Sequence, residues 1–319
     1  MTRRALAALL FASTFLIPYR GHTQEPVFRV DVRLVRILAT VKNAAGDLIG
    51  TLAKEDFEVY DNGVRQEIAI FERRTEQPLS VALLVDTSLS TAIELRYELE
   101  SVSRFFNAMF SEGNPQDSLA LYSFNYEVTL LSSFTSRRQR LEQSMKSLKP
   151  VGGTSLYDAI YLASRDLELR EGRRVIVVVT DGGDTTSAKT FHDALRAAQM
   201  ADAVLYAILV MPITSDAGRN IGGENALTTL SAGTGGRVFT PSLGSSLDKA
   251  FLDILAELRT QYYLAYYPKE VPPPKDPFHR LRIALGRPDL RVLARSGYYG
   301  DVGPETAAPG RSPAKAARE

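Results

Sequence analysis

Four segments of the chain are apolar at nearly every position, as in strands that are buried on both faces. Such strands belong to parallel sheets that are covered by helices on both sides. The four segments are VALLV (81–85), LALYSF (119–124), VIVVV (175–179) and VLYAILV (204–210).

Apolar residues between and after these segments recur at steps of three and four, which predicts amphipathic helices. The stripes are Ala92, Leu95, Leu99, Val102, Phe106 and Met109; Leu156, Ile160, Ala163 and Leu167; and Leu247, Phe251, Ile254 and Leu258. The alternation of strands and helices predicts an α/β fold over residues 80–262, with a doubly wound, mostly parallel sheet and helices on both faces.

The segments on either side of this domain have a β pattern. Residues 24–79 include the dipeptide Asn62-Gly63 between two β-rich runs, a strong hairpin signal. Residues 263–300 continue the β pattern. QYYLAYYP, which starts at Gln261, FHRLRIAL and LRVLARSGYYG are predicted to be three strands. Neither segment is long enough for a core of its own, so we expect them to pair into one small, split β-sandwich into which the α/β domain is inserted.

The two ends of the chain have their own signals. Residues 1–23 have a positive start followed by a short apolar run, which predicts a secretory signal peptide, with a retained membrane anchor as the alternative. Residues 301–319 are rich in Pro, Ala and charge and are predicted to be disordered. The protein is therefore expected to be exported, to the periplasm, the cell surface or the medium.

Net charge and cysteine content limit the kinds of partner and metal site that the protein can have. The formal charge of +1 argues against nucleic acid as a partner, and removal of residues 1–23 takes away three arginines and no acid, which makes it −2. The absence of cysteine excludes disulfides, thiol nucleophiles and cysteine–metal sites. A metal would have to be bound mainly through oxygen.

Hydroxyl and carboxylate groups lie at the ends of three of the predicted elements. Asp86, Ser88 and Ser90 come directly after the first apolar strand, Thr154 follows two glycines at a helix start, and Asp181 comes after the VIVVV strand. In an open parallel sheet, ligands bind beyond the carboxyl ends of the strands. Hydroxyls and carboxylates without His or Cys suit a hard cation, with Mg²⁺ expected and Mn²⁺ or Ca²⁺ as alternatives.

These residues carry a resemblance to a known family. The DTSLS segment, the Thr of GGTS and the Asp of TDGGD resemble the metal-ion-dependent adhesion site of von Willebrand factor type A domains. Over the whole chain, EDFEVYDNG and the QYYLAYYP and GYYG segments resemble the exported bacterial proteins of the VWFA-related Acidobacterial family.

The resemblance implies a protein-binding module without enzymatic activity. Ser88, Ser90 and Thr154 would touch the ion directly, and Asp86 and Asp181 would act through bound water. An Asp or Glu carboxylate of a partner protein would take the open coordination position. No small-molecule substrate is expected.

Three other interpretations remain open. In the first, Thr91 and Glu94 form a capping box and the hydroxyls are turn and cap residues. In the second, the protein is a Mg²⁺-dependent phosphohydrolase of the haloacid dehalogenase type, although such enzymes need a carboxylate where Ser88 stands. In the third, the domain is a scaffold in an envelope complex and binds its partners with another surface.

We expect the other notable polar and aromatic residues to have structural roles. Asp158 and Asp184 are predicted to support the loops, and none of His22, His192 and His279 has the setting of a catalytic base. The tyrosines of QYYLAYYP are expected to fill the core and rim of the sandwich rather than form a binding surface. These tyrosines are Tyr262, Tyr263, Tyr266 and Tyr267.

Overall fold

The computed structural model describes residues 34–73, 76–91, 95–111, 113–210, 220–242, 244–272 and 277–300. The predicted signal peptide, the predicted tail and the predicted cap residue Glu94 lie outside these ranges. In the described residues, no helix is long and apolar enough to cross a membrane.

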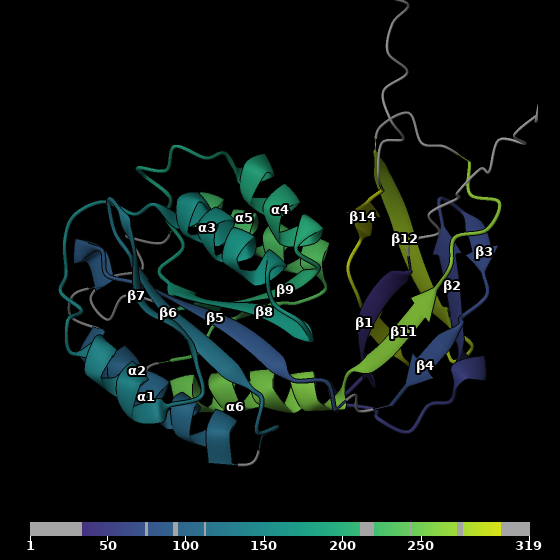
Figure 1. The fold of residues 1–319 in the computed structure, drawn as a ribbon, viewed down its shortest axis with the longest axis horizontal. Helices are drawn as coiled ribbons and strands as arrows, with labels where there is room; N and C mark the ends of the chain where they lie inside the picture. The colour runs from purple at the N-terminus through teal and green to yellow at the C-terminus, as the bar shows by residue number, and fades with distance from the viewer. Residues whose placement is uncertain are drawn as a thin grey trace, which may run out of the picture. The chain divides into compact units, whose positions relative to one another are not determined.

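A six-stranded sheet forms the centre of the α/β part, in the order β10-β9-β8-β5-β6-β7 (Figure 1). All neighbouring strands are parallel except β6 and β7. The strands are β5 (Leu79–Asp86), β6 (Ser118–Phe124), β7 (Val128–Thr135), β8 (Arg173–Thr180), β9 (Ala203–Leu209) and β10 (Val238–Phe239). The chain leaves β5 toward β6 on one side and later returns to β8 on the other, so strand order reverses at β5.

Helices cover both faces of this sheet, with α1, α2 and α6 on one face and α3, α4 and α5 on the other (Figure 1). Alternate residues of β5 enter the two cores: Val81 and Leu83 pack with α1 and α6, and Ala82 and Leu84 pack with α3 and α4. The helices are α1 (Leu95–Ser111), α2 (Arg138–Met145), α3 (Leu156–Glu168), α4 (Phe191–Met200), α5 (Ile221–Thr234) and α6 (Ser245–Thr260). The predicted doubly wound α/β fold is confirmed.

The sequence pattern located some of these elements and missed others. The four apolar segments are β5, β6, β8 and β9, and the described residues of the three stripes are on α1, α3 and α6. Ala92 of the first stripe lies outside the described residues. The antiparallel edge strand β7 was not predicted, because only one of its eight residues is buried.

Two four-stranded sheets flank the α/β part in sequence and share a third core. Their orders are β13-β1-β11-β4 and β14-β12-β2-β3. Each combines strands from before and after the α/β part: β1 pairs antiparallel with β11, and β2 with β12. The strands are β1 (Val35–Lys42), β2 (Phe57–Asp61), β3 (Val64–Gln66), β4 (Ile70–Glu72), β11 (Tyr262–Tyr266), β12 (Phe278–Leu285), β13 (Arg291–Leu293) and β14 (Gly297–Tyr299). Two 3₁₀ turns complete the described elements, η1 (Lys54–Asp56) and η2 (Leu89–Thr91).

One predicted strand of this region is wrong. LRVLARSGYYG forms two short strands in different sheets, because the extended strand is interrupted at Arg295 and Ser296. The Arg295 guanidinium donates to the Asp202 carboxylate and to the Arg36 carbonyl, and the Ser296 amide donates to the Gly233 carbonyl at 3.2 Å. These bonds replace the continuation of the ladder.

The aromatic and hairpin predictions for this region agree with the structure. Asn62 and Gly63 both have positive φ, 46° and 85°, as a two-residue type I′ turn between β2 and β3 requires. Tyr262, Tyr263 and Tyr266 are buried, and only Tyr267 is exposed.

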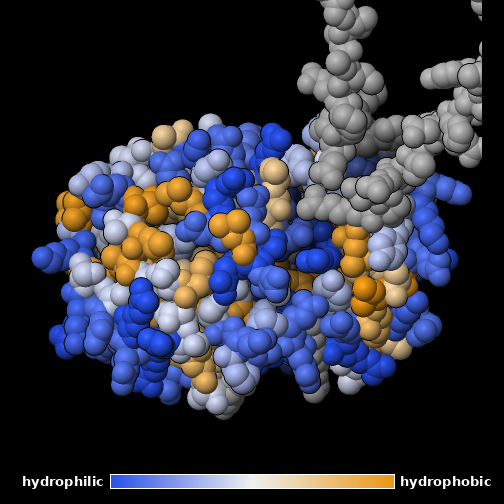
Figure 2. Space-filling model, viewed as in Figure 1, coloured by the Kyte–Doolittle hydropathy of each residue, from blue (hydrophilic) through white to orange (hydrophobic). Residues whose placement is uncertain are grey.

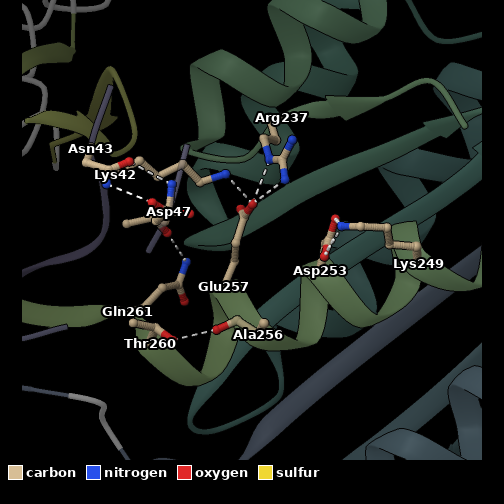
Figure 3. Close-up of polar contacts among 11 residues, drawn as sticks. Lys42, Asn43, Asp47, Arg237, Lys249, Asp253, Ala256, Glu257, Thr260 and Gln261 are labelled. Carbon is tan, nitrogen blue, oxygen red and sulfur yellow. Dashed lines mark hydrogen bonds and ion pairs between the residues drawn. The ribbon is translucent and has the colours of Figure 1, made fainter. Parts of the chain in front are cut away.

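A buried carboxylate on α6 connects three segments that are far apart in sequence. Glu257 Oε1 accepts from Lys42 Nζ of β1 at 2.7 Å and from Arg237 at 2.6 Å (Figure 3). Glu257 is 2% exposed, so both cations offset the cost of burying its charge.

Candidate functional site

Asp86 is the last residue of β5, and its carboxylate is fully buried with both oxygens engaged. Oδ1 accepts from the Ser88 amide at 2.8 Å, and Oδ2 accepts from the Thr180 hydroxyl at 2.6 Å. The first bond closes a tight turn right after the strand, and the second ties the end of β5 to the end of β8. Asp86 therefore fixes the loop that carries the two serines.

The hydroxyls of Ser88 and Ser90 lie 2.9 Å apart. Ser88 is buried and Ser90 is exposed, so the pair reaches from the interior of the loop to its surface. Two ligands at right angles around an octahedral Mg²⁺, each about 2.1 Å from the ion, would be about 3.0 Å apart. The spacing of the two hydroxyls therefore fits adjacent positions around such an ion.

The loop before α3, which carries Thr154, contacts the serine loop. The Val151 amide donates to the Thr87 carbonyl at 2.8 Å, which ties the two loops together. Gly153 has a φ of +84°, and a Cβ there would lie 2.9 Å from the Cβ of Tyr126, so only glycine fits without a shift. The backbone at Gly153 therefore passes close to Tyr126.

The loop after β8 brings Asp181 to the same end of the sheet. The Thr154 carbonyl accepts from the Thr185 amide at 2.8 Å, and the Thr154 amide donates to the Thr185 hydroxyl at 2.9 Å. Asp181 is half-buried and lies close enough to Asp86 for its charge to act on that carboxylate. All three predicted loops thus meet at the carboxyl ends of the strands.

Burial raises the pKa of Asp86 to about 6, from an ordinary value of 3.8. The hydrogen bonds from Thr180 and Ser88 oppose this rise, and the negative charge of Asp181 adds to it. A carboxylate that is hard to ionise in this place would be stabilised by a cation.

The sequence did not predict the hydrogen bonds that two further residues make in the site. Thr180 bonds the Asp86 carboxylate, and Thr185 positions the backbone of Thr154. The hydroxyl-rich run TDGGDTTS is the only sequence signal for them, and it does not say which hydroxyl meets which carboxylate.

Asp158 and Asp184 have supporting positions. Asp158 accepts from the Ala188 and Lys189 amides at 3.0 and 2.7 Å, and Asp184 accepts from the Tyr157 amide at 3.2 Å. Both carboxylates connect α3 to the loop after β8.

The site is chemically an oxygen cluster with two carboxylates. Among the described residues there is no group of three or more His, Asp or Glu side chains arranged to hold a metal. A cation here would depend on the hydroxyls of Ser88, Ser90 and Thr154 together with the carboxylates of Asp86 and Asp181.

Residues 81–183 match the family model of the von Willebrand factor type A domain. The matched region contains all five predicted site residues. This match covers the α/β part from β5 to the loop after β8. A search among curated proteins gives no match.

The solved structures to which this chain is similar are distant in sequence. The conserved hypothetical protein BatB from Bacteroides thetaiotaomicron is 19% identical with a TM-score of 0.45, over 56% of this chain and 98% of that one. The von Willebrand factor domain of a type V pilus tip protein from Porphyromonas gingivalis is 16% identical with a TM-score of 0.45, over 61% and 98%. The pilus adhesin SpaC from Lactobacillus rhamnosus GG, in its open conformation, is 8% identical with a TM-score of 0.48, over 77% and 47%.

Proposed function

We propose that this protein is an exported, non-enzymatic module that captures a partner protein through a divalent cation in a metal-ion-dependent adhesion site. The observation that carries the proposal is the pair of hydroxyls of Ser88 and Ser90, 2.9 Å apart, directly after the buried carboxylate of Asp86. The family match over residues 81–183 supports the class of domain.

The five site residues would have two roles. Ser88, Ser90 and Thr154 would bind the ion directly, and Asp86 and Asp181 would hold water molecules beside it. Asp86 already has a hydrogen bond on each oxygen, which favours an orienting role over direct ligation.

A low number of direct carboxylate ligands would leave much of the positive charge of a bound ion unneutralised. Mg²⁺ is the proposed ion, with Mn²⁺ and Ca²⁺ as alternatives, and its chemical role is to attract an Asp or Glu carboxylate of the partner. The hydroxyls are neutral ligands and leave that charge in place.

The two competing interpretations of the site fit it less well. Thr91 donates its hydroxyl to the carbonyls of Asp86 and Ser88, at 3.2 and 3.0 Å, so it stabilises the turn, but this local chemistry does not explain Thr154 or Asp181. A phosphohydrolase would need Asp86 as an accessible nucleophile, whereas Asp86 is fully buried and doubly hydrogen-bonded.

Calorimetric titration of chelator-treated protein with Mg²⁺ tests the proposal. We expect saturable binding in the wild type, its loss in Asp86→Ala, and wild-type binding in the control Asp289→Ala, which changes an exposed aspartate paired with Arg287. Absence of binding in the wild type, or wild-type binding in Asp86→Ala, would contradict the proposed metal site.

Partner capture is tested separately from metal binding. A partner that binds through the ion should be lost in Ser88→Ala while the fold, followed by circular dichroism, stays intact. If Ser88→Ala keeps its partner, the domain uses another surface and the scaffold interpretation holds instead.

A further inference from the structure

Three large apolar side chains are exposed beside the hydroxyl pair. Leu89, between Ser88 and Ser90, is 64% exposed, Tyr126 is 55% exposed and Val151 is 38% exposed. Single exposed apolar residues are common on protein surfaces, so they gain meaning only if they lie together.

All three residues are neighbours of Gly152. The Tyr126 amide donates to the Gly152 carbonyl at 3.2 Å, and the Val151 amide donates to the Thr87 carbonyl at 2.8 Å. A methyl group of Leu89 lies 3.7 Å from the position that a Cβ on Gly152 would take. Leu89, Tyr126 and Val151, here called the apolar rim, therefore form one surface.

The apolar rim adjoins the candidate site and comes from the same loops. Leu89 lies on the loop of the serine pair, Val151 lies three residues before Thr154, and Tyr126 packs on Gly153. Figure 2 shows apolar residues (orange) reaching the surface of the α/β part among polar ones. A ligand that reaches the hydroxyl pair would contact the rim.

Charge limits what such a ligand can be. With a divalent ion bound, the charges of Asp86 and Asp181 offset its two positive charges, so one ligand carboxylate already makes the site net negative and a second would be repelled. One carboxylate can be accepted at the ion, and the groups on either side of it would meet apolar surface.

We propose that the apolar rim selects a partner segment in which a single carboxylate is flanked by large apolar side chains. This inference rests on the proposed function and specifies the partner of that site. Burial of aromatic and other large apolar side chains supplies much of the affinity of protein interfaces. At this site it would add the specificity that the ion alone lacks.

Three capped pentapeptides test the proposal in the presence of saturating Mg²⁺, with binding followed by calorimetry. They are acetyl-Gly-Leu-Glu-Phe-Gly-amide, acetyl-Gly-Ser-Glu-Ser-Gly-amide and acetyl-Gly-Leu-Gln-Phe-Gly-amide. We expect the first to bind about tenfold more tightly than the second, and the third not to bind measurably. In Tyr126→Ser the advantage of the first over the second should shrink severalfold, whereas in the control Leu169→Ser it should persist, because Leu169 is 85% exposed and follows the last residue of α3.

The outcomes show whether the proposed function, this inference or both are wrong. Failure of the wild type to bind Mg²⁺ would remove the proposed function and this inference together. Mg²⁺ binding with equal affinity for the first two peptides, or with no binding of either up to millimolar concentration, would overturn the inference alone. A dimer of the chain by itself that Tyr126→Ser dissociates would assign the rim to a second copy and would also overturn it.

Discussion

At the scale of single residues, Asp86 sets the properties of the site. It is buried between the Ser88 amide and the Thr180 hydroxyl, and its pKa is raised to about 6 mainly by burial. The same burial that organises the serine loop therefore makes the ionised carboxylate unfavourable without a cation. This gives two pH effects of opposite sign.

Without metal, the stability contributed by Asp86 should fall as the pH rises. A buried acid with a raised pKa binds its proton more tightly in the folded state, so the free energy of unfolding decreases between about pH 4 and pH 6, by about 1–3 kcal/mol. Urea unfolding of the chelator-treated protein across this range measures the effect. The Asp86→Asn variant should lack this component, and an unchanged pH slope in the variant would contradict the assignment.

Metal affinity should change in the other direction. Because the ion favours the ionised carboxylate, Mg²⁺ should bind more weakly as the pH falls through about 6. Titrations at several pH values on either side of 6 measure this. An affinity that is constant across this range would mean that Asp86 does not take part.

At the scale of elements, the approach of α5 to the loop after β8 supports the site. A Cβ on Gly223 would lie 1.4 Å from the Gly182 carbonyl oxygen, so the helix start and the loop are in backbone contact. The Asn220 side chain caps α5 by accepting from the Gly223 amide at 2.8 Å. The position of Asp181 thus depends on a glycine in another element.

Two neighbouring glycines provide a matched test of this contact. Gly223→Ala should lower the free energy of unfolding by about 2 kcal/mol or more and weaken Mg²⁺ binding, because α5 has to move away from the loop. Gly222→Ala, which meets only the Asn220 side chain at 3.5 Å, should be neutral or raise stability by about 0.5 kcal/mol. Chemical denaturation and calorimetry of both variants check this, and equal effects would contradict it.

At the scale of the whole molecule, one buried carboxylate connects strands from the two ends of the described chain. Asp61 of β2 accepts from the Tyr266 and Tyr298 hydroxyls, both at 2.7 Å, and lies 3.0 Å from His279 Nδ1. These partners belong to β11, β14 and β12. The bonds thus cross from one sheet to the other and link residues on both sides of the inserted domain.

Removal of this carboxylate should loosen both sheets at once. Asp61→Ala leaves the buried Tyr266 hydroxyl without its acceptor and should lower the free energy of unfolding by about 2–4 kcal/mol. Thermal and chemical denaturation measure this. The exposed variant Asp289→Ala should match the wild type, and an Asp61→Ala variant as stable as the wild type would show that the cluster contributes little.

Much of the fold could be predicted because burial on both faces leaves a clear pattern. The apolar runs of β5, β6, β8 and β9 and the stripes on α1, α3 and α6 were readable, while the exposed β7 was not. The separate short strands β13 and β14 were missed because the break at Arg295 depends on contacts with distant residues. The wider resemblance to the Acidobacterial family, the signal peptide and the tail stay predictions.

For the candidate site, the sequence predicted only which types of residue stand at the ends of the elements, and not the contacts between them. Asp86, Ser88 and Ser90 are neighbours in sequence, so their proximity follows from one loop. The bond from Thr180 to Asp86 spans 94 residues and depends on β5 and β8 being adjacent.

The sequence by itself determined the α/β class, the end of the sheet where polar residues gather and the oxygen-only chemistry available there. The tertiary structure decided which hydroxyls bond to Asp86, how deeply that carboxylate is buried, and which apolar side chains surround the serine pair. The reason is physical: periodicity and composition record local burial, whereas contacts between loops depend on strand order and on backbone approaches such as that of Gly153 to Tyr126.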